Sequence, residues 1–164
     1  MELFRGRRLW AEKREIRLPT GSTREKIIIH PGDAVALLPM NGDRVKLLRQ
    51  YRYAIGQYIM EAPAGTLEPG ESPEACARRE LIEETGFSAT AIESRGFIWT
   101  TPGFTDEKIY LFEAHGLTPS AEFDKDDDEI IEVVDVRISD LDGMIRDGTI
   151  SDAKTIALMY RCLR

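Results

Sequence analysis

The stretch of sequence that decides the fold is residues 65–87, which read Gly65-Thr-Leu-Glu-Pro-Gly-Glu71-Ser-Pro-Glu-Ala-Cys-Ala-Arg-Arg79-Glu80-Leu-Ile-Glu83-Glu84-Thr-Gly86-Phe87. Three of its carboxylates, Glu80, Glu83 and Glu84, have the relative positions 0, 3 and 4. On a helix these spacings put all three on one face, which repels itself unless a cation lies on it. Oxygen-only ligands at this density suit Mg²⁺ or Mn²⁺, and Mg²⁺ usually also takes substrate phosphates as ligands. The stretch therefore predicts a divalent-metal site.

Local signals set the ends of this helix. Ser72 and Pro73 read as the N-cap and the first helical residue, because a hydroxyl can accept an orphan amide hydrogen and proline loses no hydrogen bond there. Gly86 tolerates positive φ and is a typical helix stop. The expected helix therefore has about three to four turns.

The expected helix has two faces. Ala75, Leu81 and Ile82 are predicted to lie opposite the carboxylates, so that one face is buried and the other is offered to metal. Arg79 precedes Glu83 by four positions and is expected to hold it in place.

A plain alternative is a solvated Glu/Arg helix, which is the usual interpretation of a Glu-rich helix. The detail argues against it. The segment has glycine, five residues, glutamate, seven residues, then Arg-Glu-aliphatic-any-Glu-Glu-any-Gly-hydrophobic. Seven fixed identities coincide by chance on the order of 10⁻⁸ per start position. The segment resembles the Nudix box. The resemblance implies cleavage of a nucleoside diphosphate linked to another moiety, with divalent metals held by the box helix.

Composition is typical of one enzyme domain spanning residues 1–164. The chain is 42% apolar, and its length favours one domain with a sizeable core. Its apolar runs fall far short of a membrane span, and its start lacks a signal-peptide core, so we expect a cytoplasmic protein without a membrane partner. A net charge of −7 argues against a nucleic-acid surface.

Cysteine and histidine carry little functional signal. Cys76 and Cys162 form no metal-spaced or redox motif and are expected to be reduced packing residues. His30 and His115 stand alone, which disfavours a histidine-based metal site.

The order of predicted elements indicates an α/β fold. Strands are expected on both sides of the box helix, and helices at the end of the chain. The hairpin of residues 33–40 and 45–51 is joined by Asn41-Gly42, a pair that readily adopts two positive φ values. The other expected strands are residues 58–62, 95–100, 108–114 and 130–136, and the expected helices are residues 139–146 and 151–163. The resemblance implies an α/β/α sandwich around a mixed sheet, with an N-terminal strand pair in about residues 1–30.

Segments outside the box are similar to the ADP-ribose pyrophosphatase branch. Pro102 follows Gly86 by sixteen residues, the spacing of that branch's marker. Residues 49–52, 61–65 and 148–158 are also similar, so the resemblance runs through most of the chain from His30 onward.

This resemblance implies roles for individual residues. The metal ligands would be the Ala64 carbonyl, Glu80 and Glu84, with Glu83 ligating or orienting. The residues lining the substrate would be Arg52, Glu61, Thr66, Thr101, Pro102, Gly103 and Glu107. Plainer interpretations are a simple turn at Pro102-Gly103, an exposed strand cation at Arg52, and surface acids at Glu61 and Glu107.

An acidic stretch, residues 124–129, has two interpretations. On composition it is a solvated loop. In the resembled branch an acidic loop here closes over the diphosphate, and by alignment Asp127 matches the general base and Glu129 a metal ligand. The family commonly has glutamate where this chain has Asp127, so a shorter side chain must reach the water.

Residues 1–30 alternate charges with apolar residues, which suits extended strands. In the resembled enzymes this region builds a homodimer contact and stacks the adenine. Trp10 is a candidate for that stacking, but an interface or core role is the expectation.

Together these features predict Mg²⁺-dependent hydrolysis of ADP-ribose to AMP and ribose 5-phosphate. Alternatives are another nucleoside diphosphate sugar such as GDP-mannose or UDP-glucose, a non-catalytic nucleotide sensor, and an interaction domain stabilised by Mg²⁺. Three crowded glutamates disfavour the last two, because a binding module does not need them.

Overall fold

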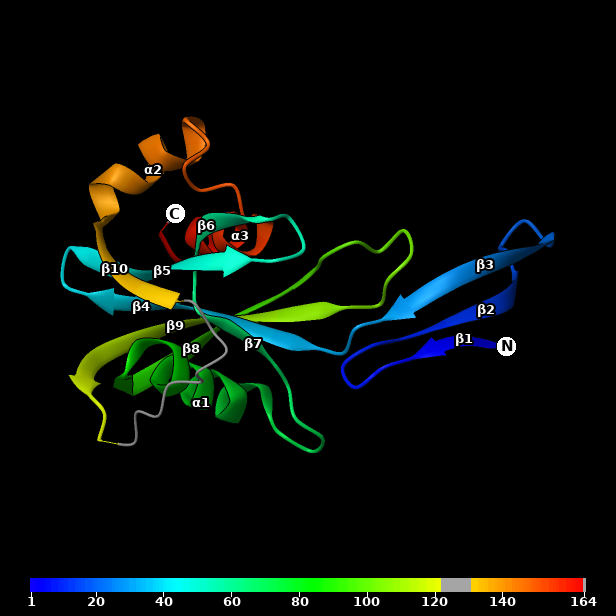
Figure 1. Cartoon of the computed structure of the whole chain (residues 1–164), viewed down its shortest axis with the longest axis horizontal. Helices are drawn as coiled ribbons and strands as arrows, with labels where there is room; N and C mark the ends of the chain where they lie inside the picture. The colour runs from blue at the N-terminus through cyan, green and yellow to red at the C-terminus, as the bar shows by residue number, and fades with distance from the viewer. Residues whose placement is uncertain (122–130, 164) are drawn as a thin grey trace.

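The structure is a computed structural model that describes residues 1–121 and 131–163. Within these residues the chain forms a three-stranded N-terminal sheet and a seven-stranded main sheet (Figure 1). No helix in the described part is long and apolar enough to cross a membrane.

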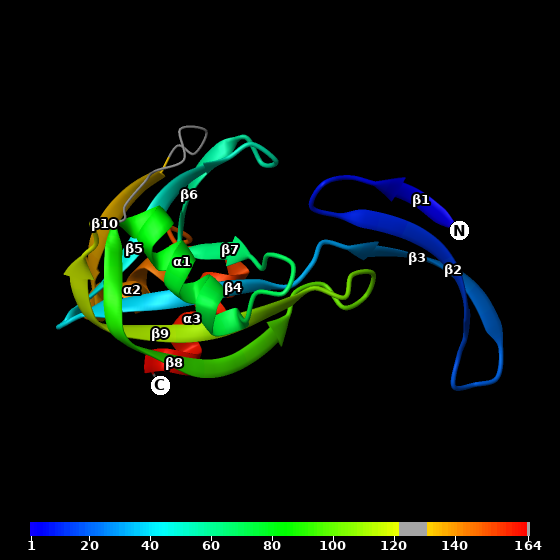
Figure 2. The same cartoon turned by 90° about the horizontal axis from the view of Figure 1, so that it is seen from below.

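The N-terminal sheet lies to one side of the main body (Figures 1 and 2). Its strands β1 (Glu2–Arg5), β2 (Trp10–Arg17) and β3 (Thr23–His30) are antiparallel, in the order β1-β2-β3. Strands β2 and β3 are the expected pair, and β1 adds a third strand at its edge.

The main sheet has the order β10-β5-β4-β9-β8, with β6 paired to β5 and β7 paired to β4. Strands β4 and β9 are parallel, while the other pairs are antiparallel, so the sheet is mixed. The strands are β4 (Ala34–Asn41), β5 (Arg44–Arg52), β6 (Gln57–Glu61), β7 (Ala64–Thr66), β8 (Phe87–Trp99), β9 (Lys108–Pro119) and β10 (Ile131–Arg137).

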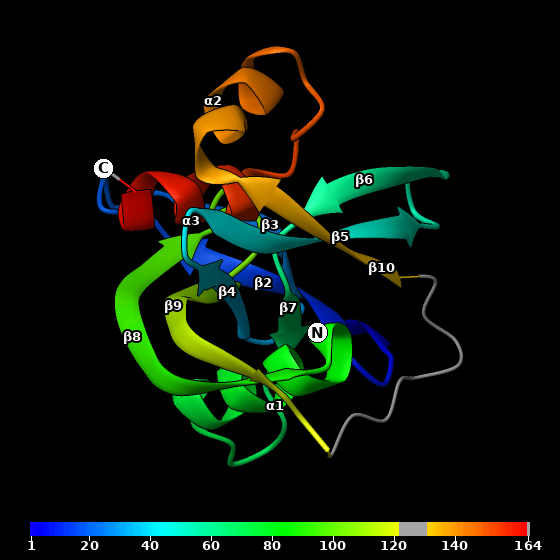
Figure 3. The same cartoon turned by 90° about the vertical axis from the view of Figure 1, so that its left-hand side faces the viewer.

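Helices cover both sides of this sheet. Helix α1 (Pro73–Thr85) lies on one side, and α2 (Ile138–Arg146) and α3 (Ala153–Leu163) lie on the other (Figure 3). The predicted α/β/α sandwich around a mixed sheet is confirmed.

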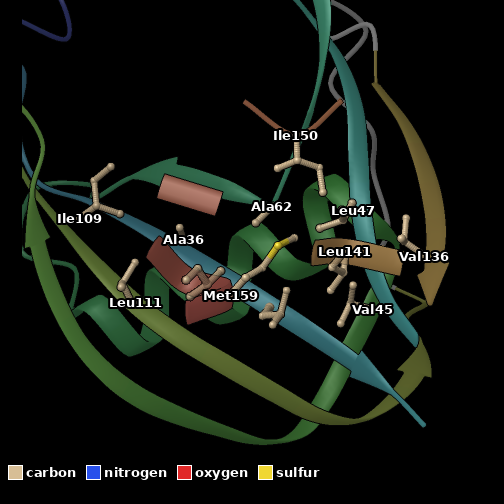
Figure 4. Close-up of a cluster of buried hydrophobic side chains, with 12 residues drawn as sticks. Ala36, Val45, Leu47, Ala62, Ile109, Leu111, Val136, Leu141, Ile150 and Met159 are labelled. Carbon is tan, nitrogen blue, oxygen red and sulfur yellow. The ribbon is translucent and has the colours of Figure 1, made fainter. Parts of the chain in front are cut away.

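Alternation along β4 divides the core into two layers. Val35 and Leu37 point to the α1 side, where they pack with Cys76, Ala77 and Leu81. The residues between them point to the other side, because successive strand side chains face opposite ways. That second layer, drawn in Figure 4, includes Ala36, Leu38, Leu47, Leu111, Leu141, Leu158 and Met159.

Two local predictions were wrong in detail. The β4–β5 turn is Gly42-Asp43, because Asn41 still pairs with Arg44, and only Gly42 has positive φ. Strand β8 begins at Phe87, directly after the helix stop, and not near residue 95. Pairing with β9 extends it, and the prediction overlooked the alternation of apolar and polar residues from Phe87 to Ala91.

A buried threonine ties α3 to the end of β6. The Thr155 side chain is fully buried, and its hydroxyl accepts a hydrogen bond from the Ala62 amide (2.8 Å) and donates one to Asp152 Oδ2 (2.5 Å). The Thr155 amide donates to the same oxygen (3.0 Å). Because Ala62 is two residues before β7, this contact sets the path of the chain into the box.

Replacing Thr155 with valine should therefore destabilise the protein by about 1–3 kcal/mol, since the buried Ala62 amide loses its acceptor. Urea unfolding measures the change. The control is Thr149→Val, which is exposed and should change stability by less than about 0.5 kcal/mol. Equal stability of the two variants would contradict the role of this contact.

Candidate functional site

Helix α1 has the ends that the sequence predicts. The Ser72 hydroxyl accepts a hydrogen bond from the Ala75 amide (3.2 Å), and Pro73 is the first helical residue. Gly86 ends the helix at φ 75°, with its amide donating to the Ile82 carbonyl (2.8 Å).

The buried face of α1 differs from the predicted one. Ala75 is exposed, while Glu80 and Glu84 are each only 8% exposed and lie on the same buried stripe as Leu81. Of the three clustered glutamates, only Glu83 is exposed. Carboxylates and leucine share the buried face because α1 packs on both β4 and β7, and β7 presents polar backbone to the carboxylates.

Strand β7 lies directly against these carboxylates. Glu84 Oε2 accepts a hydrogen bond from the Ala64 amide at 2.7 Å. A Cβ atom on Gly65 would overlap the carboxylate of Glu80, so only glycine permits this approach. The box glycine is therefore required for contact between strand and helix, and the contact fixes the directions of both glutamates.

Arg79 forms ion pairs with three glutamates of the box. Its guanidinium donates to both oxygens of Glu71 (3.0 Å each) and, through Nη1, to Glu80 (2.7 Å) and Glu83 (2.8 Å). Nη2 also approaches the Thr66 carbonyl (3.3 Å). The predicted Arg79–Glu83 contact is confirmed.

These contacts shift two pKa values. Hydrogen bonding to Glu71, more than any other influence, raises the pKa of Arg79. The reciprocal hydrogen bond lowers the pKa of Glu71 to about 2. The contact with Glu71 was not predicted because the two residues are eight positions apart, although Glu71 is a fixed glutamate of the box.

The donor set fits a divalent cation in its chemistry. Carboxylates and a backbone carbonyl are the hard oxygen ligands that Mg²⁺ and Mn²⁺ prefer. Because Gly65 has no Cβ atom, the Glu80 carboxylate can lie next to the β7 backbone. In residues 1–121 and 131–163, no three His, Cys, Asp or Glu side chains are already grouped as a metal cluster. Glu80 and Glu83 are paired with the Arg79 cation.

Arg52 and Glu61 form a bidentate ion pair at the edge of this site. Nε and Nη2 of Arg52 donate to the two Glu61 oxygens at 2.7 and 2.9 Å. Burial opposes the charge of Arg52, but hydrogen bonds and the charges of Glu61 and Glu84 outweigh it, so the pKa of Arg52 is raised.

Glu61 is not the surface acid of the plainer interpretation. Its side chain is 1% exposed, and it also pairs with Lys154 of α3. Lys154 in turn contacts Asp152 (3.0 Å). Lys154 was not predicted as a site residue, although it lies within residues 148–158, one of the segments that carry the resemblance.

The remaining predicted substrate residues lie in two places. Thr66 is exposed at the end of β7. Thr101, Pro102 and Gly103 are exposed in the loop between β8 and β9, where Glu107 Oε2 accepts a hydrogen bond from Thr100 (2.6 Å). Asp127 and Glu129 lie outside the described residues.

The cysteines have the environment of packing residues. Burial raises the pKa of Cys76 to about 12 and that of Cys162 to about 11, so both thiols stay protonated at neutral pH.

Replacing Gly65 with alanine should weaken Mn²⁺ binding about 10- to 100-fold while the fold survives, because the new methyl group displaces the Glu80 carboxylate. Calorimetric titration with Mn²⁺ measures the affinity, and circular dichroism checks the fold. Gly143→Ala is the matched control, since a Cβ there meets open space. Unchanged Mn²⁺ affinity in Gly65→Ala would show that Glu80 is not held by this contact.

Known proteins resemble this chain over most of its length. The NUDIX domain family matches residues 30–159. An ADP-ribose pyrophosphatase of Bacillus subtilis is 34% identical over 166 residues, covering 99% of this chain and 90% of that protein. A methanol dehydrogenase activator of Bacillus methanolicus is 35% identical over 162 residues, with coverages of 97% and 88%. A GDP-mannose pyrophosphatase of Cronobacter sakazakii is 37% identical over 138 residues, with coverages of 78% and 72%.

Among solved structures, one described as the crystal structure of an ADP compounds hydrolase superposes with a TM-score of 0.87. It is 23% identical and covers 98% of this chain and 88% of that one, which shows a common fold. The residues matched by the family model include the box, whose helix and strand contacts are described above. Divalent metal ions are the general cofactors of this family. The chain therefore belongs to the Nudix family of hydrolases.

Proposed function

We propose that this protein hydrolyses the diphosphate bond of ADP-ribose to AMP and ribose 5-phosphate, with Mg²⁺ as the cofactor and Mn²⁺ as a substitute. The observation that carries hydrolysis is the pair of buried carboxylates, Glu80 and Glu84, held against the β7 backbone. The choice of ADP-ribose is supported by the nearly full-length similarity to the B. subtilis pyrophosphatase.

The metal would be held by Glu80, Glu84 and the Ala64 carbonyl, with Glu83 as a further ligand or an orienting group. A divalent cation supplies positive charge for the diphosphate and lowers the pKa of an attacking water. The chain prepares these ligands before binding. The Ala64 amide orients Glu84, the close approach of Gly65 orients Glu80, and Arg79 holds Glu83.

Substrate contacts would come from Arg52 and from the β8–β9 loop. Glu61 fixes the plane of the Arg52 guanidinium through two hydrogen bonds, which suits recognition of an anionic or hydroxyl-rich group. Thr66, Thr101, Pro102, Gly103 and Glu107 would line the remainder of the substrate. Asp127 as general base and Glu129 as a further ligand complete the proposal.

A second candidate is hydrolysis of another nucleoside diphosphate sugar. The GDP-mannose pyrophosphatase of C. sakazakii favours it through 37% identity, but over a smaller share of this chain. A non-catalytic nucleotide sensor is disfavoured by the complete set of box carboxylates, since binding alone does not require them.

A product assay over a panel of nucleoside diphosphate sugars and nucleoside triphosphates tests the substrate. With Mg²⁺ present, ADP-ribose should show the highest kcat/KM, and AMP should be a product. A tenfold preference for GDP-mannose or a triphosphate, about 1.4 kcal/mol in the transition state, would refute the assignment.

A variant of Glu84 tests whether turnover in this assay occurs at the proposed site. Glu84→Gln should lower kcat by about 10²- to 10⁴-fold, the scale of losing one major electrostatic stabiliser. Glu74→Gln is the matched control, because Glu74 is exposed on the same helix and pairs only with Arg78 among the described contacts.

We also propose a homodimer in which the N-terminal sheet contributes to the contact. The sheet exposes Leu3, Phe4, Leu9 and Ile27, and it lies beside the main body without a core of its own (Figure 2). An exposed apolar surface of this kind is typical of interaction sites.

Light scattering at micromolar concentration should give about twice the chain mass of 18.6 kDa. Phe4→Ser, in an exposed position of β1, should shift the equilibrium toward monomer. A fully active wild-type monomer would contradict the proposed dimer.

A further inference from the structure

His30 joins the N-terminal sheet to the main body. It is the last residue of β3, and its side chain is 12% exposed. The imidazole stacks on the indole of Trp10 from β2, with ring centroids 3.8 Å apart and planes inclined by 13°. Both ring nitrogens of His30 contact carboxylates. Nδ1 lies 2.6 Å from Asp106 Oδ2, and Nε2 lies 3.3 Å from Glu12 Oε1.

The shorter contact is a hydrogen bond with a defined direction. A carboxylate oxygen accepts, so the form of the imidazole that makes this bond is the one with a hydrogen on Nδ1. The two residues are 76 positions apart in the sequence. Asp106 itself belongs to the β8–β9 loop, directly before Glu107.

Backbone contacts bind the same loop to β3. The Ile29 amide donates to the Phe104 carbonyl (2.9 Å), and Ile29 forms a parallel bridge with Thr105. Within the loop, the amides of Phe104 and Thr105 both donate to the Thr101 carbonyl (3.1 and 3.0 Å). Figures 1 and 2 show the loop extending from the main sheet toward the end of β3. The loop is thus an internally bonded turn fixed at one place on the N-terminal sheet.

The chain just after His30 is bonded to the Nudix box. The Asp33 carbonyl accepts a hydrogen bond from the Leu67 amide (3.0 Å), directly after β7. The Asp33 carboxylate accepts a second hydrogen bond, from the Lys108 amide at the start of β9 (3.4 Å). Residues 29–33 therefore stand between the β8–β9 loop and the strand that carries Ala64 and Gly65.

We propose that His30 is a positioning residue for substrate binding. Through Asp106 it holds Thr101, Pro102 and Gly103 at a fixed place relative to β7, and it makes substrate affinity depend on the attachment of the N-terminal sheet. The effect on substrate rests on the proposed function. The anchoring of the loop does not, and the two are measured separately.

Kinetics test the effect on substrate. His30→Ala should raise the KM for ADP-ribose about five- to tenfold, the scale of losing one charge-assisted hydrogen bond, and leave kcat within about twofold. The split is expected because the box carboxylates keep their own contacts. His115→Ala is the matched control, since His115 lies toward the far end of β9 and is paired with Glu113.

Amide hydrogen exchange tests the anchoring. In His30→Ala and in Asp106→Ala, exchange at the Ile29 amide, which donates to the Phe104 carbonyl, should be about tenfold faster, because the turn is released from β3. The Leu37 amide, which donates to the Pro63 carbonyl in the core, reports global stability and should be unchanged. Asp106 is exposed, so its variant removes the contact without a buried cavity.

A conservative variant separates positioning from general damage. His30→Asn places a carboxamide nitrogen near the position of Nδ1, and it should bring KM back to within about threefold of wild type. Wild-type KM and wild-type exchange in His30→Ala would overturn the proposal, as would His30→Asn behaving like His30→Ala. If ADP-ribose is not turned over by the wild type, faster exchange at the Ile29 amide in both alanine variants still supports the anchor, and only the substrate is refuted.

Discussion

The close approach of β7 to α1 is the constraint on which the site depends. Gly65 lacks the Cβ that would overlap Glu80, and the Ala64 amide donates to Glu84. Both contacts require β7 to run beside β4, where Ala64 pairs with Ala36. They also require α1 to lie on the same side of β4, which Leu81 secures by packing in the core layer of Val35 and Leu37. The packing of the core and the positions of the two carboxylates are therefore set by the same few residues.

Placing carboxylates in this position would be costly without partners. Removing a charge from water costs several kcal/mol, and pairing and hydrogen bonding must offset that cost. Each buried acid of the site has such a partner. Glu80 contacts Arg79, Glu84 accepts the Ala64 amide, and Glu61 receives both Arg52 and Lys154. These partners offset the cost of burying the carboxylates.

Local signals made the box helix predictable. Its ends depend on Ser72, Pro73 and Gly86, which act on the backbone within a few residues of themselves. The buried face was misjudged at Ala75, because which face a helix buries depends on the neighbours that it meets. Here one neighbour is the polar backbone of β7, so carboxylates and leucine share a stripe. Helical periodicity carries no signal for that arrangement.

Contacts between residues far apart in the sequence were also not predicted. Glu71 with Arg79 could have been inferred from the fixed positions of the box, whereas His30 with Asp106 and Lys154 with Glu61 join segments 76 and 93 residues apart. Nothing in a single sequence pairs such residues. Trp10 shows the same limit. Its ring is stacked on His30 and has the Arg5 guanidinium 5.0 Å from its centroid, so in this structure it packs within the N-terminal sheet.

The charges around the site explain why a cation is needed for an anionic substrate. Arg79 is shared among Glu71, Glu80 and Glu83, and acids outnumber it. Arg52 and Lys154 are matched by Glu61 and Asp152, which leaves no surplus of positive charge in that group. Glu84 adds a further negative charge, and the whole chain carries −7. A diphosphate approaching these residues meets net repulsion, so the protein's own side chains can orient it but cannot attract it. In the proposed function the attraction comes from a divalent metal, whose proposed ligands are the same carboxylates that make the site repulsive.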